Sequence, residues 1–134
     1  MIYQYKKQPP FNNHLGIQID EWQEGHVVIS ATVRAEHMNS QGLPHGGFIT
    51  TLIDIAGSYC GLYCPKPNHQ RKSLTLSLTT SFTGMAKTNQ LRAIGKLTSS
   101  GRKIFYSCTE VYDSVGTLIA IGQMTMRYRT GSEP

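Results

Sequence analysis

Four residues of this chain have types and spacing that could support catalysis. His45, Gly46 and Gly47 are consecutive, and Asp54 follows nine residues after His45. Asp54 is the only charged residue between positions 48 and 64, where apolar residues recur every three to four positions, so the stretch predicts a helix. The other face of this helix is small and polar, which indicates burial. A buried, unpaired carboxylate is costly, so Asp54 needs a partner or a function.

The start of this helix has the properties of an anion site. If the helix begins near Gly46, its first backbone N–H groups are unpaired and, with the helix dipole, favour negative charge. Glycine at positions 46 and 47 lets a substrate atom approach the backbone closely. A thioester or ester carbonyl could develop its oxyanion against the Gly46 N–H, worth about 3 kcal/mol per donor. A structural interpretation stays open, in which His45 only caps the helix and Asp54 only bonds a neighbouring group.

Helix geometry separates Asp54 from His45. Nine helical residues turn by about 180° and rise by ~13.5 Å. A site that uses both residues must therefore be assembled from two copies of the chain, and a two-fold dimer would create two equivalent sites. Small residues on the polar face predict a surface for the partner: Thr50, Gly57 and Gly61.

The remaining segments predict a sheet around this helix within a single domain over 1–134. A short helical turn near Pro10 and a turn at 20–25 precede an alternating strand at 26–35. Four further segments read as strands, at 74–82, 90–98, 104–112 and 117–129. Tight turns between the last strands predict a four-strand antiparallel meander that curls around the helix. We expect residues 1–10 to be a loose arm and 130–134 a disordered tail.

Composition narrows the function classes. The chain has 134 residues, only 16% of them charged, and a net charge of +5, which suits a phosphate-bearing ligand or ordinary surface charge. Lysines and arginines are scattered, so no nucleic-acid stripe is evident. The N-terminus lacks the apolar core of a signal peptide, and no apolar run is long enough to span a membrane. We therefore expect neither a nucleic-acid nor a membrane partner.

Three cysteines favour a reducing, cytoplasmic setting. Their odd number and irregular spacing do not form a disulfide framework. Cys60 and Cys64 share a helix face and His69 follows, but a zinc site would need a fourth ligand. Small buried core residues are the preferred interpretation, and we expect no metal.

The motif Asn39-x-x-Gly42-x-x-His45-Gly46-Gly47, followed by Leu52-Ile53-Asp54, resembles hotdog-fold thioesterases of the phenylacetate-pathway (PaaI-like) type. The similarity covers about 11–129 and includes the closing segment 113–122. It implies an α+β hotdog fold, in which a curved antiparallel sheet wraps around one long central helix. It also implies an acyl-CoA thioesterase that releases free acid and CoA without a cofactor. Members of this family are similar in forming homodimers with interface sites, often paired into homotetramers.

The resemblance implies a role for each matching residue. Asp54 corresponds to the catalytic carboxylate, acting as general base or nucleophile. Gly46 corresponds to the residue whose amide polarises the thioester carbonyl. His45 and Asn39 correspond to residues that orient this carbonyl and the attacking water, and Thr75 to a hydroxyl that helps to hold the water.

Substrate contacts are weaker assignments. The substrate-binding candidates are Gly47, Phe82 and the loop cations Lys87, Arg102 and Lys103, with Arg71 and Lys72 as further cations. Candidate acyl-pocket residues, which core packing explains equally well, are Phe48, Tyr59, Tyr63 and Phe82. The rival function is a non-catalytic dimer that binds or senses acyl-CoA, and a third is a purely structural dimer.

Overall fold

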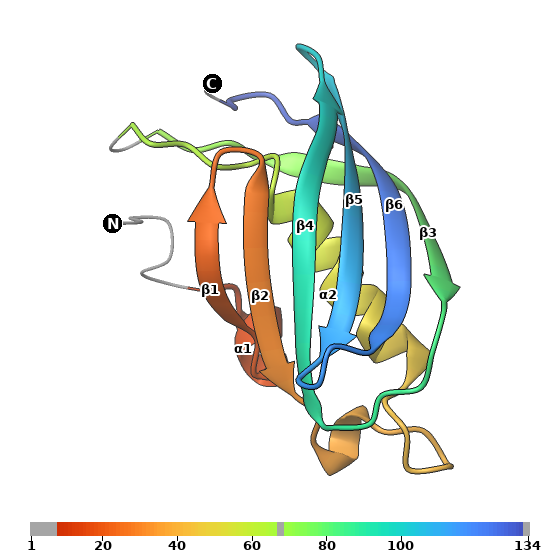
Figure 1. Cartoon of the computed structure of the whole chain (residues 1–134). Coiled ribbons are helices and arrows are strands. Elements are labelled where there is room, and N and C mark those ends of the chain that lie inside the picture. The colour runs from red at the N-terminus through yellow and green to blue at the C-terminus, as the bar shows by residue number, and fades with distance from the viewer. Residues whose placement is uncertain (1–7, 67–68, 133–134) are drawn as a thin grey trace.

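The computed structural model describes residues 8–66 and 69–132. Two α-helices and six strands make up this part of the chain (Figure 1), together with a 3₁₀ turn at Ala35–His37. The helices are α1 (Pro10–Leu15) and α2 (Gly46–Tyr59). The strands are β1 (Gln18–Gln23), β2 (His26–Thr32), β3 (Ser73–Phe82), β4 (Gln90–Ser100), β5 (Ile104–Asp113) and β6 (Leu118–Tyr128).

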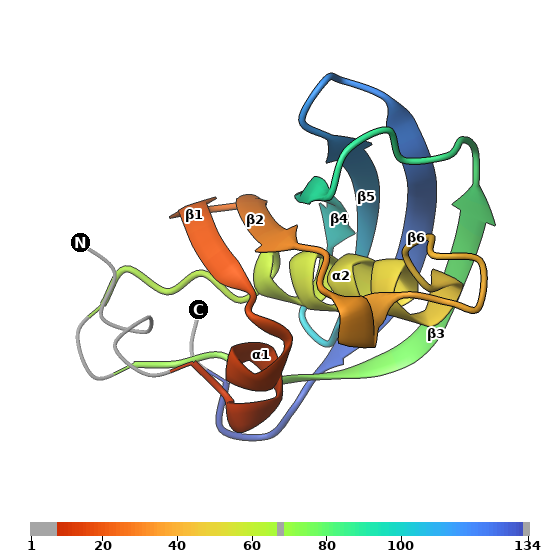
Figure 2. The same ribbon diagram turned by 90° about the horizontal axis from the view of Figure 1, so that it is seen from below.

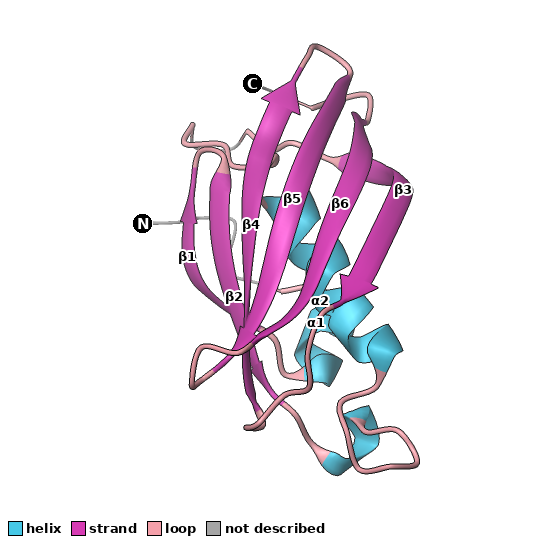
Figure 3. Ribbon diagram, turned by 45° about the vertical axis from the view of Figure 1, so that its right-hand side comes forward, coloured by secondary structure: helices cyan, strands magenta, loops and turns pink. Residues whose placement is uncertain are grey.

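One antiparallel sheet carries all six strands, in the order β1-β2-β4-β5-β6-β3. The sheet curves around α2, which lies along its concave face (Figures 2 and 3). The inward side chains of the strands and the apolar face of α2 form one core that includes Ile29, Leu52, Ile53 and Phe105. The predicted arrangement of a curved sheet around a single long helix is confirmed.

The helix packs directly on the middle of the sheet because a glycine lies beneath it. A Cβ atom on Gly95 of β4 would collide with the backbone carbonyl of Ala56 in α2. The same close approach accounts for Gly57 and Gly61, whose Cβ positions are occupied by Met124 and by the ring of Phe105. The prediction that these two glycines face a partner chain is wrong, because the chain's own sheet covers them.

Strand β3 occupies a different place from the one predicted. It pairs with β6 at the edge of the sheet and not with β4, so the meander comprises only β4, β5 and β6. Residues 83–89 cross from β3 to the middle of the sheet, below the ends of β5 and β6 in Figure 1. Sequence order favoured the meander, but the 83–89 connection is long enough to reach a distant strand.

Several predicted boundaries also move. Residues 20–23 belong to β1 and not to a turn, and α2 ends at Tyr59 and not near Cys64. Most of the predicted arm lies outside the described residues, as do positions 133 and 134 of the predicted tail. Ser132 is not loose, because its hydroxyl donates to the Lys72 carbonyl and accepts from the Lys72 N–H. None of the helices in the described ranges has the length and apolar character needed to cross a membrane.

Candidate active site

Asp54 projects from α2 towards the edge strand β3. The residue is half-buried, and the Thr75 hydroxyl donates to Asp54 Oδ1 over 2.9 Å in an exposed position. A bulge between Thr75 and Ser77 interrupts the pairing of β3 with β6 at this point. Asp54 Oδ2 accepts no hydrogen bond from any described residue, so one carboxylate oxygen is available to a water molecule or a substrate.

The N-terminal end of α2, called the helix mouth below, has a hydrogen-bond donor, the Gly46 N–H, that is unpaired among the residues that the structure describes. His45 caps the helix, because its Nδ1 accepts from the Gly47 N–H over 2.8 Å. Since Nδ1 acts as the acceptor, Nε2 is the ring nitrogen that can donate a hydrogen bond, and the side chain is exposed. The Gly46 N–H makes no hydrogen bond within the described residues. The Phe82 ring lies over Gly46, 3.3 Å from where its Cβ would be.

Asn39 holds the loop that leads to this helix mouth. Its Oδ1 accepts from the N–H groups of Gln41 and Leu43 over 2.9 and 3.1 Å. The side-chain oxygen is thus committed to the loop backbone, while Nδ2 has no partner among the described residues. The polar atom that Asn39 can offer to a substrate is therefore a donor.

His37 anchors the same loop, and sequence reasoning missed it. Its buried ring stacks on Phe48 with 4.2 Å between centroids, and Nδ1 accepts from the Arg34 N–H over 3.0 Å. Its carbonyl accepts from the His45 N–H over 2.8 Å. Burial, followed by the nearby Arg34 guanidinium, lowers the pKa of His37, so the ring is held neutral. Only its position two residues before Asn39 could have drawn attention to it.

Within one chain the two halves of the site lie far apart. Gly46 and Asp54 are eight residues apart on α2, a rise of about 12 Å, and they contact β3 at Phe82 and Thr75 respectively. A hollow of about 190 Å³ opens at the helix mouth, and Asp54 does not line it. Its lining residues are Asn39, Leu43, Pro44, Gly46, Ile49, Phe82, Gly84, Met85 and Ala86.

The candidate phosphate contacts also divide between two ends of the sheet. Arg102 and Lys103 form the turn between β4 and β5, at the upper end in Figure 1. Lys87 lies at the other end, where its N–H donates to Asp113 Oδ2 over 2.8 Å. The length of β5 separates these ends by about 30 Å, so one phosphate cannot contact both within a single chain.

The other side chains considered from sequence belong mainly to the core. Phe48 is buried against His37, and Tyr59 and Tyr63 pack edge-on against Trp22. Cys60 is a buried free thiol, and burial raises its pKa to about 12. A thiol held protonated in this way is a poor metal ligand.

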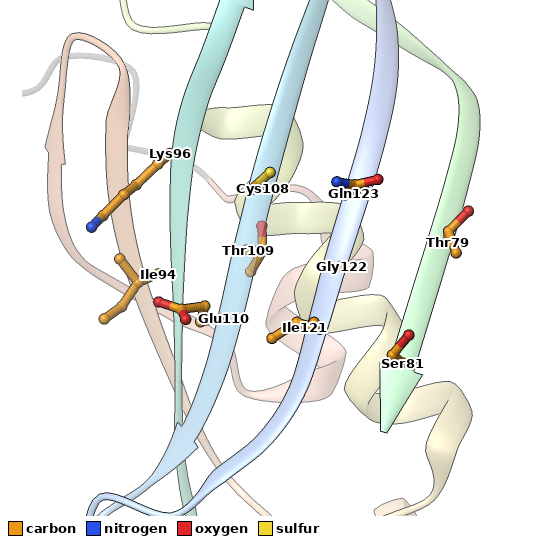
Figure 4. A pocket seen from close by; sticks show the side chains of 10 residues that line it. All are labelled: Thr79, Ser81, Ile94, Lys96, Cys108, Thr109, Glu110, Ile121, Gly122 and Gln123. Carbon is orange, nitrogen blue, oxygen red and sulfur yellow. The ribbon is translucent and has the colours of Figure 1, made fainter. Parts of the chain in front are cut away.

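A second hollow, of about 320 Å³, lies on the face of the sheet turned away from α2 (Figure 4). Lys96, Glu110 and Gln123 project into it from three neighbouring strands. None of the predicted catalytic residues lines this hollow, and the sheet itself separates it from α2.

A family comparison, together with the fold, identifies the class of enzyme. The chain belongs to the thioesterase superfamily, whose family model matches residues 41–120, and it is a thioester hydrolase. The matched segment contains the whole of α2 and runs into β6.

Relatives agree with this assignment. A relative from Archaeoglobus fulgidus, whose name assigns it provisionally to the esterases, is 28% identical over 98% of this chain and 81% of its own length. A mutant of the thioesterase SAV0944 from Staphylococcus aureus has a TM-score of 0.83 and 20% identity, covering 90% of this chain and 99% of that one. The PaaI protein of the E. coli phenylacetic acid degradation operon has a TM-score of 0.82 and 22% identity, covering 96% and 90%. These structural matches confirm the hotdog fold.

Proposed function

We propose that this thioester hydrolase acts on acyl-CoA, releasing a carboxylic acid and free CoA. The observation that carries the proposal is Asp54, a half-buried residue on an otherwise uncharged helix whose carboxylate accepts a hydrogen bond from the Thr75 hydroxyl. A carboxylate oriented in this way, with one oxygen free, has the geometry of a general base or a nucleophile. The reaction needs water and no cofactor.

In the proposed reaction Asp54 takes a proton as water attacks the thioester carbon. The carbonyl oxygen becomes an oxyanion, which accepts a hydrogen bond from the Gly46 N–H. The carbon–sulfur bond then breaks, the acid forms, and the CoA thiolate leaves and takes up a proton. In the alternative route Asp54 attacks the carbon itself, the carbon–sulfur bond breaks, and the CoA thiolate leaves and takes up a proton. Water then cleaves the resulting mixed anhydride, which releases the acid and restores the Asp54 carboxylate.

A second copy of the chain must bring the two halves of this site together. Strand β3 is an edge strand that exposes Leu74, Leu76 and Phe82, each more than half accessible. Such an edge is open to pairing with another strand. We propose that two copies pair antiparallel through β3, which brings one chain's Asp54 near the partner's Gly46. Further pairing of two such dimers into a tetramer is compatible with this arrangement.

The remaining candidates take supporting roles. His45 and the Nδ2 group of Asn39 orient the carbonyl and the water. Gly47 keeps the helix mouth open, and Phe82 lies beside the acyl group. Contacts to the CoA phosphates are assigned to Arg102 and Lys103, and not to Lys87, which lies at the opposite end of the sheet in the same chain.

Release of free thiol from a panel of acyl-CoA thioesters, of short, long and aromatic acyl groups, tests the proposal. We expect Asp54→Asn to abolish release, because the amide accepts no proton from water. Asp20→Asn, an exposed control, should behave like wild type. Acyl-CoA binding without thiol release by the wild type would instead support the non-catalytic alternative, and equal activity of both variants would remove Asp54 from the mechanism.

A further inference from the structure

A basic cavity lies at the upper end of the sheet in Figure 1, where β6 ends and the turn between β4 and β5 lies. Its volume is about 730 Å³, within the range of small-molecule sites. Five cations and no carboxylate line it, and the full lining is Arg71, Gly101, Arg102, Lys103, Arg127, Tyr128, Arg129, Thr130, Gly131 and Ser132.

The positive charge of this cavity is not balanced by paired carboxylates in the described part of the chain. None of its five cations forms an ion pair there, whereas Arg34 pairs with Glu36 over 3.5 Å. The chain has 13 cations and 8 acids, so these five equal its entire excess of +5. Such a concentration of unpaired charge in one concave site attracts an anion.

Arg71 is held in place within the cavity. Its guanidinium carbon lies 3.9 Å from the centroid of the Tyr128 ring, a cation–π contact. Tyr128 is fixed in turn, because its hydroxyl donates to the Gly61 carbonyl over 2.9 Å. Arg71 Nε is buried and has no hydrogen-bond partner, so a preoriented donor remains unsatisfied.

The cavity adjoins the Asp54 half of the site. Arg127 pairs with Leu74 across the β3–β6 ladder, and the next pair is Met126 with Thr75, the residue that bonds Asp54. Arg129 continues the same edge, where its N–H donates to the Lys72 carbonyl over 2.9 Å. The backbone positions of Arg127 and Arg129 thus lie within about 10 Å along the strand from the pair that contains Thr75, although the exposed Arg127 side chain projects from the opposite face of the sheet to Met126 and Thr75.

We infer that this basic cavity binds the phosphorylated nucleotide of the CoA thioester, an inference that rests on the proposed function. Arginine pairs with phosphate through two parallel hydrogen bonds, and four arginines line the cavity. The flexible pantetheine arm of CoA connects such a nucleotide to a thioester at Asp54. Lys87 is about 30 Å from the cavity in the same chain and does not contribute to it.

The test compares an acyl-CoA with the corresponding acyl-pantetheine, which lacks the nucleotide. The preference for acyl-CoA, expressed as the ratio of the two kcat/KM values, should fall about tenfold or more in Arg127→Gln. The decrease should come from KM and not from kcat. Arg92→Gln, an exposed cation of β4 outside the cavity, should keep the wild-type ratio. An unchanged ratio in Arg127→Gln, or equal loss with both substrates, would overturn the inference.

Calorimetry with adenosine 3′,5′-bisphosphate separates this inference from the proposed function. We expect saturable binding to wild type, weakened about tenfold in Arg71→Gln and Arg127→Gln. Inorganic phosphate, as a second titrant, should bind more weakly, because it lacks the nucleoside. Binding of the bisphosphate without hydrolysis of any acyl-CoA would sustain the nucleotide site while rejecting the proposed function. Hydrolysis of acyl-CoA without bisphosphate binding would sustain the proposed function and reject the nucleotide site.

Discussion

The Gly46 amide can be tested at the level of one atom. Gly46 is the first residue of α2, where proline is tolerated, and His45 already has the extended backbone that precedes proline (φ −62°, ψ 138°). Gly46→Pro therefore removes the N–H while keeping the helix, and kcat should fall about 100- to 1,000-fold. Gly46→Ala is the matched control, because it meets the same exposed Phe82 ring but retains the donor. Equal losses in the two variants would show that the N–H does not stabilise the transition state.

His37 should make stability depend on pH. The folded protein lowers the pKa of this ring from its ordinary 6.5, so the unfolded chain takes up a proton at higher pH. The contribution to stability is full above pH 6.5 and is lost as the pH falls below it, towards the lowered folded-state value. Urea unfolding at pH 7.5 and 5.5 should show this decline in wild type and a smaller one in His37→Gln. Exposed His14→Gln should keep the wild-type decline, and a full decline in His37→Gln would contradict the assignment.

The residues of the site differ in how far sequence could predict them. Asp54 was identifiable, because a single carboxylate on an apolar helix is anomalous by itself. His37 was not, since its stacking on Phe48 depends on a loop whose path the sequence pattern does not define. The hydroxyl of Thr75 was assigned through resemblance alone, and the structure places it on Asp54.

Among the elements, local patterns predicted the helix and strands, whereas pairing partners were harder to predict. Turns of a few residues determine that β4, β5 and β6 are neighbours, because the chain has no other route. The alternation within β3 indicated a strand but contained nothing about β6, whose paired residues lie 38 to 55 positions further along the chain. The edge position of β3, on which the proposed dimer depends, therefore came from the structure.

The contact between α2 and β4 gives an element-scale prediction. Gly95→Ala would place a Cβ against the backbone carbonyl of Ala56, which cannot rotate away as a side chain could. We expect the free energy of unfolding to fall by about 1–3 kcal/mol, as measured by urea denaturation. Gly101→Ala, in the turn after the same strand, would place its Cβ at an ordinary contact distance of 3.6 Å from the Ile104 carbonyl and should change it by less than about 0.5 kcal/mol. Similar values for the two variants would mean that α2 does not lie directly on β4.

At the scale of the molecule, one chain holds two half-sites at opposite ends of β3. Sequence geometry predicted this separation from the helical turn alone, and the structure keeps it: both half-sites lie on α2, about 12 Å apart along its axis, and contact β3 at Phe82 and Thr75. The prediction was wrong about the contact surface, since the chain's own sheet covers Gly57 and Gly61. The exposed edge of β3 takes their place in the proposed dimer.

The central claim is that each active site combines Asp54 of one chain with Gly46 of another, and mixed dimers test it most directly. Asp54→Asn and Gly46→Pro are each expected to be inactive alone. The two variants are co-expressed, and the mixed dimer is purified through a different tag on each chain. In this mixed dimer one site would contain both substitutions, and the other would contain the unaltered Asp54 and the unaltered Gly46. The account predicts about half the wild-type activity per mixed dimer. A mixed dimer as inactive as its parents would contradict it, because every site would then lie within one chain.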